Sequence, residues 1–241
     1  MNIEAGTQPG YILYNPTNYK EAYLIDGCGR VVNKWTSNYM ASHTIYLRPN
    51  GSLLRTRLLT NAVINGGGGS GGGVELLDWN SNLVWEYTYN NDLVRHHHDI
   101  HPMPNGNVLI LAWEKKTSEE AIAEGRNPAL LPDNQVWPEH IVEVRPIVPD
   151  GGEIIWEWHA WDHLIQDFDD TKENYGVVAD HPELIDVNFT DDGGKDWLHA
   201  NAIDYNPELD QIMISAHAFN ELWVIDHSTT TAQSASHTGG R

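Results

Sequence analysis

The stretch from Arg95 to Glu114 reads RHHHDIHPMPNGNVLILAWE. It places three consecutive histidines, His96 to His98, ahead of a turn at Pro104-Asn105-Gly106 and an apolar run from Val108 to Trp113. Asn-Gly accepts the positive φ angles of a tight two-residue turn, and β-branched and aromatic residues suit a strand. The stretch therefore predicts a β-hairpin whose histidines lie near the start of its first strand, in a protein rich in β-structure.

The same hairpin occurs elsewhere in the chain. His43 and His98 each lie six residues before a Pro-Asn-Gly turn that opens an apolar strand. His199 lies before a looser turn and a further apolar strand. The three turns are Pro49-Asn50-Gly51, Pro104-Asn105-Gly106 and Asn206-Pro207-Glu208. Three histidines therefore occupy one position of a repeating hairpin.

A second hairpin alternates with the first. It consists of an apolar strand that ends in an acidic residue or just after one, a turn, and a strand that carries Trp. Copies begin at Ala22, Val74 and His140, and a partial copy begins at Leu222. Two alternating hairpins make a four-stranded unit, and such units at a period of about 40–55 residues are typical of a β-propeller. A β-sandwich is the alternative, but it does not require this internal similarity. The sequence therefore predicts an all-β protein with the β-propeller architecture.

Three segments interrupt the repeat. The Gly-rich segment 65–73 lacks the Lys-Ser/Thr ending of a phosphate-binding loop, so we expect a flexible loop. Thr117 and Glu120 form the pattern of a capping box, which predicts a short helix in an insertion near 117–130. A long insertion near 159–195 is rich in acidic and aromatic residues, and insertions of this size often form lids or rims.

The number of repeats predicts an incomplete propeller. Residues 1–241 are interpreted as one partial propeller domain of about three to four blades, whereas closure requires at least about four. An open propeller would expose unpaired sheet edges. We therefore expect the chain to be a fragment of a longer protein and, on its own, to be weakly stable or to self-associate.

The charge of the chain restricts its partners. The 241 residues carry a formal net charge of −20. Nucleic acid and anionic membrane surfaces would repel so negative a surface, so neither is expected as a partner. No apolar run approaches the length of a membrane span, and residues 1–10 lack the basic and apolar regions of a signal peptide. The single cysteine excludes an internal disulfide, and the oligomeric state does not follow from the sequence.

The repeated histidines are the first candidates for a functional site. Inner strands of a propeller line its channel, so His43, His98 and His199 would converge on one axis from blades far apart in sequence. Ligands often bind in the mouths of barrels and channels, which predicts a histidine pocket. The alternative is that each histidine only bonds a neighbouring loop.

Three further residues are candidates for substrate contacts. His97 and Asp99 flank His98, and Trp161 from the long insertion could stack on an aromatic ligand. Trp156 and Trp158 share one face of a strand, so we expect both in the core. A metal is not expected, because successive side chains of a strand point to opposite faces and the chain has no Cys set and no H-E-x-x-H.

Several stretches are similar to those of a known family. They are His98-Asp99 with Pro104-Asn105-Gly106, Asp196 to Asn201, WPEHIVEV at 137–144, WDHLI at 161–165 and FNELWVIDHS at 219–228. With them the chain resembles the bacterial aryl-sulfate sulfotransferase family from about Gly10 to its C-terminus. The resemblance implies a six-bladed propeller that moves a sulfuryl group from one phenol to another without a nucleotide cofactor. A channel histidine becomes transiently sulfated, while other His and Arg side chains hold the sulfate oxygens.

The resemblance also suggests roles for three histidines. His98 and His199 match pocket histidines of the family, and His217 lies eighteen residues beyond His199, where some members carry Arg. A protonated histidine can donate to a sulfate oxygen but lacks the permanent charge and the fork of Arg. The nucleophilic histidine of the family lies in a later blade, so the covalent step is not expected of this chain alone. We expect His98, His199 and His217 to be catalytic, by binding sulfate oxygens or by moving protons.

The resemblance further implies a phenolic sulfate donor, a phenolic acceptor, and the periplasm or secretion as the location. The competing interpretation is a non-catalytic propeller that binds carbohydrate or protein, because fold does not fix function. An unperturbed histidine titrates near pH ~6.5. Binding of an aryl sulfate is therefore expected to strengthen as the pH falls from about 8 to about 6.

Overall fold

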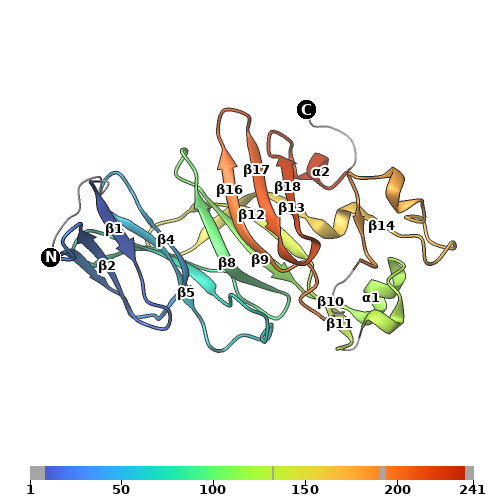
Figure 1. The fold of residues 1–241 in the computed structure, drawn as a ribbon, viewed down its shortest axis with the longest axis horizontal. Helices are drawn as coiled ribbons and strands as arrows, with labels where there is room; N and C mark the ends of the chain where they lie inside the picture. The colour runs from blue at the N-terminus through green and yellow to red at the C-terminus, as the bar shows by residue number, and fades with distance from the viewer. Residues whose placement is uncertain (1–8, 132, 190–193, 237–241) are drawn as a thin grey trace.

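Four antiparallel sheets follow one another along the chain. The computed structural model describes residues 9–131, 133–189 and 194–236. The four sheets contain three, four, four and three strands, and they lie side by side across the molecule (Figure 1). Within the described residues, helix is limited to short segments. The all-β class expected from the sequence is therefore confirmed.

The strands of each sheet are neighbours in sequence. The first sheet contains β1 (Tyr11–Tyr14), β2 (Glu21–Asp26) and β3 (Val31–Thr36). The second contains β4 (Ala41–Leu47), β5 (Leu53–Leu58), β6 (Gly72–Leu77) and β7 (Leu83–Thr88). The third contains β8 (Val94–Pro102), β9 (Val108–Glu114), β12 (Glu139–Pro146) and β13 (Gly152–His159). The fourth contains β16 (Ala200–Asn206), β17 (Gln211–Ala216) and β18 (Glu221–Asp226).

Two insertions, a 3-10 helix at His217–Phe219 between β17 and β18, and a short helix after β18 carry the remaining elements. Between β9 and β12 lie β10 (Lys116–Thr117), α1 (Ser118–Ala123), a 3-10 helix at Pro128–Leu130 and β11 (Gln135–Val136). Between β13 and β16 lie 3-10 helices at Ala160–His163 and Val178–Asp180 and the parallel pair β14 (Leu164–Ile165) and β15 (Ile185–Asp186). The helix α2 (Thr231–Ser234) follows β18. Among the described residues, no helix has the length and apolar character needed to span a membrane.

The capping box at the start of α1 has the expected geometry. The Thr117 side chain accepts a hydrogen bond from the backbone N–H of Glu120, and the Glu120 side chain accepts one from the backbone N–H of Thr117. Two backbone donors that helix formation leaves unpaired are thereby satisfied. The short helix expected in this insertion is confirmed.

The two Pro-Asn-Gly hairpins turn through three residues. The N–H of Gly51 donates to the carbonyl of Arg48 over 2.9 Å, and the N–H of Arg48 donates to the carbonyl of Ser52 over 2.8 Å. Gly51 and Gly106 take φ of +83° and +92°, whereas the asparagine before each does not take positive φ. The expected two-residue turn is therefore wrong. Proline presets the first position of a type I turn, and glycine supplies the left-handed third residue.

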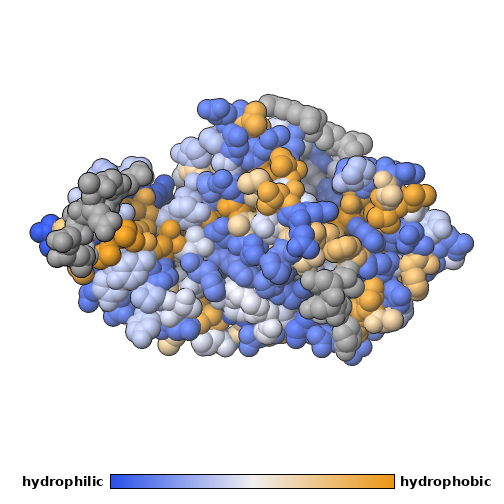
Figure 2. Space-filling model, viewed as in Figure 1, coloured by the Kyte–Doolittle hydropathy of each residue, from blue (hydrophilic) through white to orange (hydrophobic). Residues whose placement is uncertain are grey.

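Hydrophobic cores lie between successive sheets. One core joins the first and second sheets, a second joins the second and third, and the largest joins the third and fourth sheets with both insertions. Trp156 and Trp158 belong to the largest core and are 4% and 6% exposed, which confirms the expectation for both. On the face shown in Figure 2, hydrophilic residues predominate and apolar residues form separate patches.

The first strands of the second, third and fourth sheets meet in the middle of the molecule. β8 contacts both β4 and β16, and it lies between them in Figure 1. These three strands carry, or directly follow, the three histidines of the repeating hairpin. Side chains more than a hundred residues apart in sequence therefore reach one place.

Candidate active site

Four histidine rings from four segments form a continuous row. The ring centres of His43 and His98 are 5.6 Å apart, those of His98 and His199 4.8 Å, and those of His199 and His217 5.3 Å. His98 and His199 in the middle are half-buried, whereas His43 and His217 at the ends are exposed. We call these four residues the histidine row. The structure thus brings together the three repeated histidines and adds His217 at one end.

An irregularity in each first strand directs its histidine into the row. The pairing of β8 with β9 shifts between His96 and Ile100, around His98, and that of β4 with β5 shifts between Ala41 and Ile45, around His43. The pairing of β16 with β17 shifts between Ala200 and Ile203, directly after His199. His98 and His199 both have φ of +48°. Residues other than glycine rarely adopt this left-handed conformation, and such strain tends to persist at functional sites. β-Bulges re-aim side chains beside active sites, which is their effect here.

His97 lies beneath the row and is fully buried. Its Nδ1 is 2.9 Å from Nδ1 of His98, and its Nε2 is 2.6 Å from Oε2 of Glu139. Its ring stacks on Trp113 with 4.0 Å between centres. Oε1 of Glu139 accepts the backbone N–H of Ala200 over 2.8 Å. The sequence suggests His97 for substrate contact, but its position suits the support of His98.

Asp196 orients His199. Its Oδ2 is 2.6 Å from Nδ1 of His199, and its Oδ1 accepts the indole N–H of Trp113 over 2.9 Å. A carboxylate on one imidazole nitrogen selects the tautomer and directs the other nitrogen outward. Sequence reasoning missed Asp196, although the residue begins one of the stretches that carry the family resemblance.

The Gly-rich segment 65–73 packs directly on the row. A Cβ added at Gly69 would lie 2.2 Å from ring atoms of His98, and one added at Gly68 would lie 3.0 Å from Cε1 of His199. Only residues without side chains allow the backbone this close to the rings. The expectation of a flexible loop therefore missed a part of the site whose composition is explained by this contact.

Arg95 holds the Gly-rich segment in place from below. Its guanidinium donates to the backbone carbonyls of three residues at the two ends of the loop, Leu59, Ile64 and Gly71. Arg95 is 2% exposed. A planar group with five donors can join several carbonyls at once, so Arg95 links β8 to the loop that covers the histidine row.

Asp99 connects the three first strands. Oδ1 accepts the hydroxyl of Thr44 over 2.8 Å, and Oδ2 accepts the backbone N–H of Ile203 over 3.0 Å. Burial raises the pKa of Asp99, while these hydrogen bonds act in the opposite direction. Asp99 therefore sets the distances between the strands that carry the row. Its suggested contact with substrate stays a prediction.

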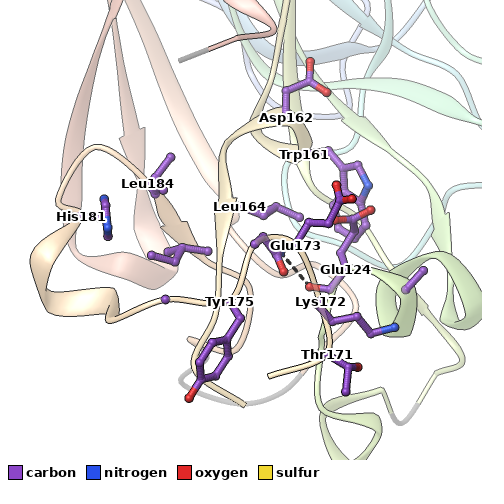
Figure 3. A pocket seen from close by; sticks show the side chains of 14 residues that line it. Glu124, Trp161, Asp162, Leu164, Thr171, Lys172, Glu173, Tyr175, His181 and Leu184 are labelled. Atoms are coloured by element: carbon purple, nitrogen blue, oxygen red, sulfur yellow. Dashed lines mark hydrogen bonds between the residues drawn. The ribbon is translucent and has the colours of Figure 1, made fainter. Parts of the chain in front are cut away.

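Trp161 lies apart from the histidine row. It belongs to the 3-10 helix after β13, and Nζ of Lys116 is 5.5 Å from its ring centre. It lines a pocket of about 620 Å³ together with residues of the long insertion. Figure 3 shows Trp161 and His181 on different sides of this pocket. Among the described residues that line it, none belongs to the row, so the stacking role suggested for Trp161 gains no support from this geometry.

Burial keeps the centre of the site neutral. Desolvation lowers the pKa of His97 and of His98 to about 3, and it also lowers the pKa of His43. Burial raises the pKa of Glu139. His98 therefore acts as a neutral imidazole at physiological pH. Burial of His98 therefore argues against a contribution of this histidine to the expected strengthening of binding between about pH 8 and 6, and that pH dependence stays a prediction.

The row offers imidazole N–H donors and imidazole lone pairs in a partly desolvated setting. Such groups can hydrogen-bond to an oxyanion and can transfer protons. Within the described residues, no group of three His, Cys, Asp or Glu side chains is arranged to hold a metal ion. The chemistry that this geometry supports is hydrogen bonding to an anionic group together with proton transfer.

Comparison with known proteins identifies one family. The family model described as arylsulfotransferase (ASST) matches residues 14–233. The match extends over all four sheets and contains every histidine of the row. No curated protein matches the chain.

Proposed function

The chain belongs to the arylsulfotransferase family, and from this membership we propose that the protein transfers a sulfuryl group from a phenolic sulfate ester to a phenolic acceptor. We interpret the four sheets as successive blades of a β-propeller whose inner strands carry the histidine row. The observation that carries the proposal is the row itself, with neighbouring ring centres 4.8–5.6 Å apart. The proposed location, in line with the family, is the periplasm or the cell exterior.

The row matches the chemical needs of the reaction. A sulfate monoester is a poor electrophile until its oxygens are held and its leaving phenolate is protonated. His98 and His199, whose ring centres are 4.8 Å apart, are assigned to hold the sulfuryl oxygens. His217 is assigned to assist from the exposed end of the row. Donors already fixed by Asp196 and by His97 need little reorganisation in the transition state.

The transfer is proposed to proceed through two displacements on an imidazole. The donor phenol leaves in the first displacement, and the acceptor phenol attacks in the second. We assign the row to sulfate binding and proton transfer, and the covalent step to the histidine that the family resemblance places in a later blade. The donor phenol and the acceptor phenol then occupy the same row in turn. The group that protonates the departing phenol must therefore regain a proton from the attacking phenol.

The test is acceptor-dependent transfer from a chromogenic aryl sulfate, in protein that includes the later blade with the nucleophilic histidine. Phenolate release should depend on an added phenol, should need no nucleotide, and should yield the sulfated acceptor. His98→Ala and His199→Ala should each reduce it strongly, whereas His181→Ala, which changes a histidine of the separate pocket, should not. Absence of transfer, together with aryl sulfate binding that both row variants leave unchanged, would contradict the proposal and would favour a non-catalytic binding module.

A further inference from the structure

Three residues form a line from the protein core to the histidine row. Oε2 of Glu139 is 2.6 Å from Nε2 of His97, and Nδ1 of His97 is 2.9 Å from Nδ1 of His98. The side chains of Glu139 and His97 are 0% exposed. The first two members are therefore sealed from water, and only His98 reaches the site.

We propose that Glu139, His97 and His98 form a proton relay that delivers a proton to the departing phenolate and recovers one from the attacking phenol. The inference rests on the proposed function and deepens it, because it names the source of the proton. His98 would touch the substrate, whereas Glu139 and His97 would act through it.

The positions of the hydrogens follow from the geometry. Two nitrogens that face each other can share only one hydrogen, so either His97 or His98 donates. Burial raises the pKa of Glu139, so its neutral form donates O–H to Nε2 of His97. His97 then donates from Nδ1 to Nδ1 of His98, which leaves the hydrogen of His98 on Nε2. The hydrogen bond that the structure gives to the His98 ring uses Nδ1, which leaves Nε2 for the substrate.

The step balances without charging a histidine. As the aryl S–O bond breaks, its electron pair passes to the phenolate oxygen, which takes the proton from Nε2 of His98. Nδ1 of His98 takes the proton of His97, and Nε2 of His97 takes that of Glu139. Glu139 becomes a carboxylate that accepts N–H from His97 and from Ala200. When the acceptor phenol attacks the sulfuryl group, its proton returns along the same line.

The pKa directions agree with such a relay. Neutral forms of His97 and His98 are favoured because burial opposes an imidazolium at either position. Direct transfer from a protonated His98 would require the state that burial disfavours. A relay avoids that state, since each imidazole gains one proton as it loses another. The other ionisable groups that face the three residues are Arg95, Asp196, His43, His96, His140 and His199.

The pair of Asp196 and His199 differs from the pair of Glu139 and His97 in its exposure to water. The side chain of Asp196 is 16% exposed, whereas that of Glu139 is fully buried. Water therefore reaches the carboxylate of Asp196, whereas, among the described residues, Glu139 connects to the site only through the two histidines. Storage of a proton between the two displacements therefore requires Glu139, and Asp196 only orients His199.

The first test uses donors with different leaving groups, in protein that includes the later blade with the nucleophilic histidine. In Glu139→Gln the amide can still donate to His97 and accept from Ala200, but it cannot release a proton. Transfer from phenyl sulfate should fall by about 100-fold or more, in the range of general acid catalysis. Transfer from 4-nitrophenyl sulfate should change little, because 4-nitrophenolate leaves without protonation. Glu143→Gln, in the same strand but bound to His227 and Asn107, should affect neither donor. Equal losses with both donors, or no loss, would overturn the relay.

The second test needs no turnover and separates the relay from the proposed function. In protein with ¹⁵N-labelled histidine, the hydrogen of His98 should lie on Nε2 and that of His97 on Nδ1. As the pH rises through the pKa of Glu139, both hydrogens should shift to the opposite nitrogens together, and Glu139→Gln should abolish this shift. Absence of the paired shift over the pH range of the folded protein, or its persistence in Glu139→Gln, contradicts the relay. Absence of sulfuryl transfer with the shift intact instead contradicts the proposed function.

Discussion

The Nδ1 atoms of His97 and His98 lie 2.9 Å apart, although the two residues are adjacent in one strand. Neighbouring side chains of a regular strand point to opposite faces. The contact exists because His98 takes φ of +48° where the pairing of β8 with β9 shifts. Local backbone strain therefore connects the buried Glu139 to the histidine row through His97.

Gly69→Ala should disrupt the site. The added Cβ would lie 2.2 Å from the His98 ring, at a residue whose φ is +67°. The histidine ring must move, so aryl sulfate binding should weaken by at least about tenfold, which corresponds to about 1.4 kcal/mol. Gly106→Ala is the control, because it also has positive φ but no atom within 4 Å of the added Cβ. The measurement is the calorimetric binding constant of each variant for an aryl sulfate. Equal losses of affinity would show that backbone strain alone, and not the contact with His98, is responsible.

His217→Arg should strengthen binding. The variant places a permanent charge and a bidentate donor at the exposed end of the row, where some family members carry Arg. A hydrogen bond to a charged group typically contributes about 1.5–3 kcal/mol, so the dissociation constant for an aryl sulfate should fall by about tenfold or more. His181→Arg adds the same charge at the separate pocket and should leave the constant unchanged. An equal gain in both variants would mean that net charge alone acts.

Stability should decrease as the pH falls below about 6.5. Burial holds the pKa of His97, His98 and His140 at about 3 in the folded protein, whereas in the unfolded chain they titrate near ~6.5. The unfolded state therefore binds more protons between these values, which favours unfolding. His159, His227 and Glu139, whose pKa values are raised, act in the opposite direction. They are fewer than the histidines with lowered pKa, which also include His43, His96 and His101.

The measurement is the urea midpoint at several pH values between about 7.5 and 4. His98→Gln should flatten the decline, because it removes one group that stays neutral only when folded. A urea midpoint that rises as the pH falls would contradict the claim that burial lowers the pKa of these histidines.

The chain should associate through the edge of its fourth sheet. β18 pairs only with β17 among the described strands, and Leu222 and Val224 on it are 65% and 61% exposed. Unpaired apolar edges favour association, and a lysine on the edge opposes it. Sedimentation should show a concentration-dependent oligomer that Val224→Lys reduces and Leu209→Lys, at an exposed turn, does not. A monomer at every concentration would contradict this prediction.

The repeat pattern predicted the parts of the site that recur in sequence. His43, His98 and His199 share one position relative to a turn, so their convergence could be inferred from spacing alone. Glu139 could not be inferred in this way, because it reaches His97 from another strand of the same sheet, 42 residues along the chain. Asp196 lies three residues before His199, but it does not recur with the hairpin. The Gly-rich segment was misjudged because its composition is explained by histidine rings that pack on it from other segments of the chain. The position of Trp161 depends on how the long insertion packs, which no local pattern determines.

Calorimetric titration with 4-nitrophenyl sulfate tests the central claim, that the histidine row binds the sulfuryl group. The wild-type protein should bind this ester, and the His98→Ala/His199→Ala double variant should lose at least about tenfold in affinity, or about 1.4 kcal/mol. His181→Ala should bind as the wild type does. Equal affinity of the wild type and the double variant would contradict the assignment of the site.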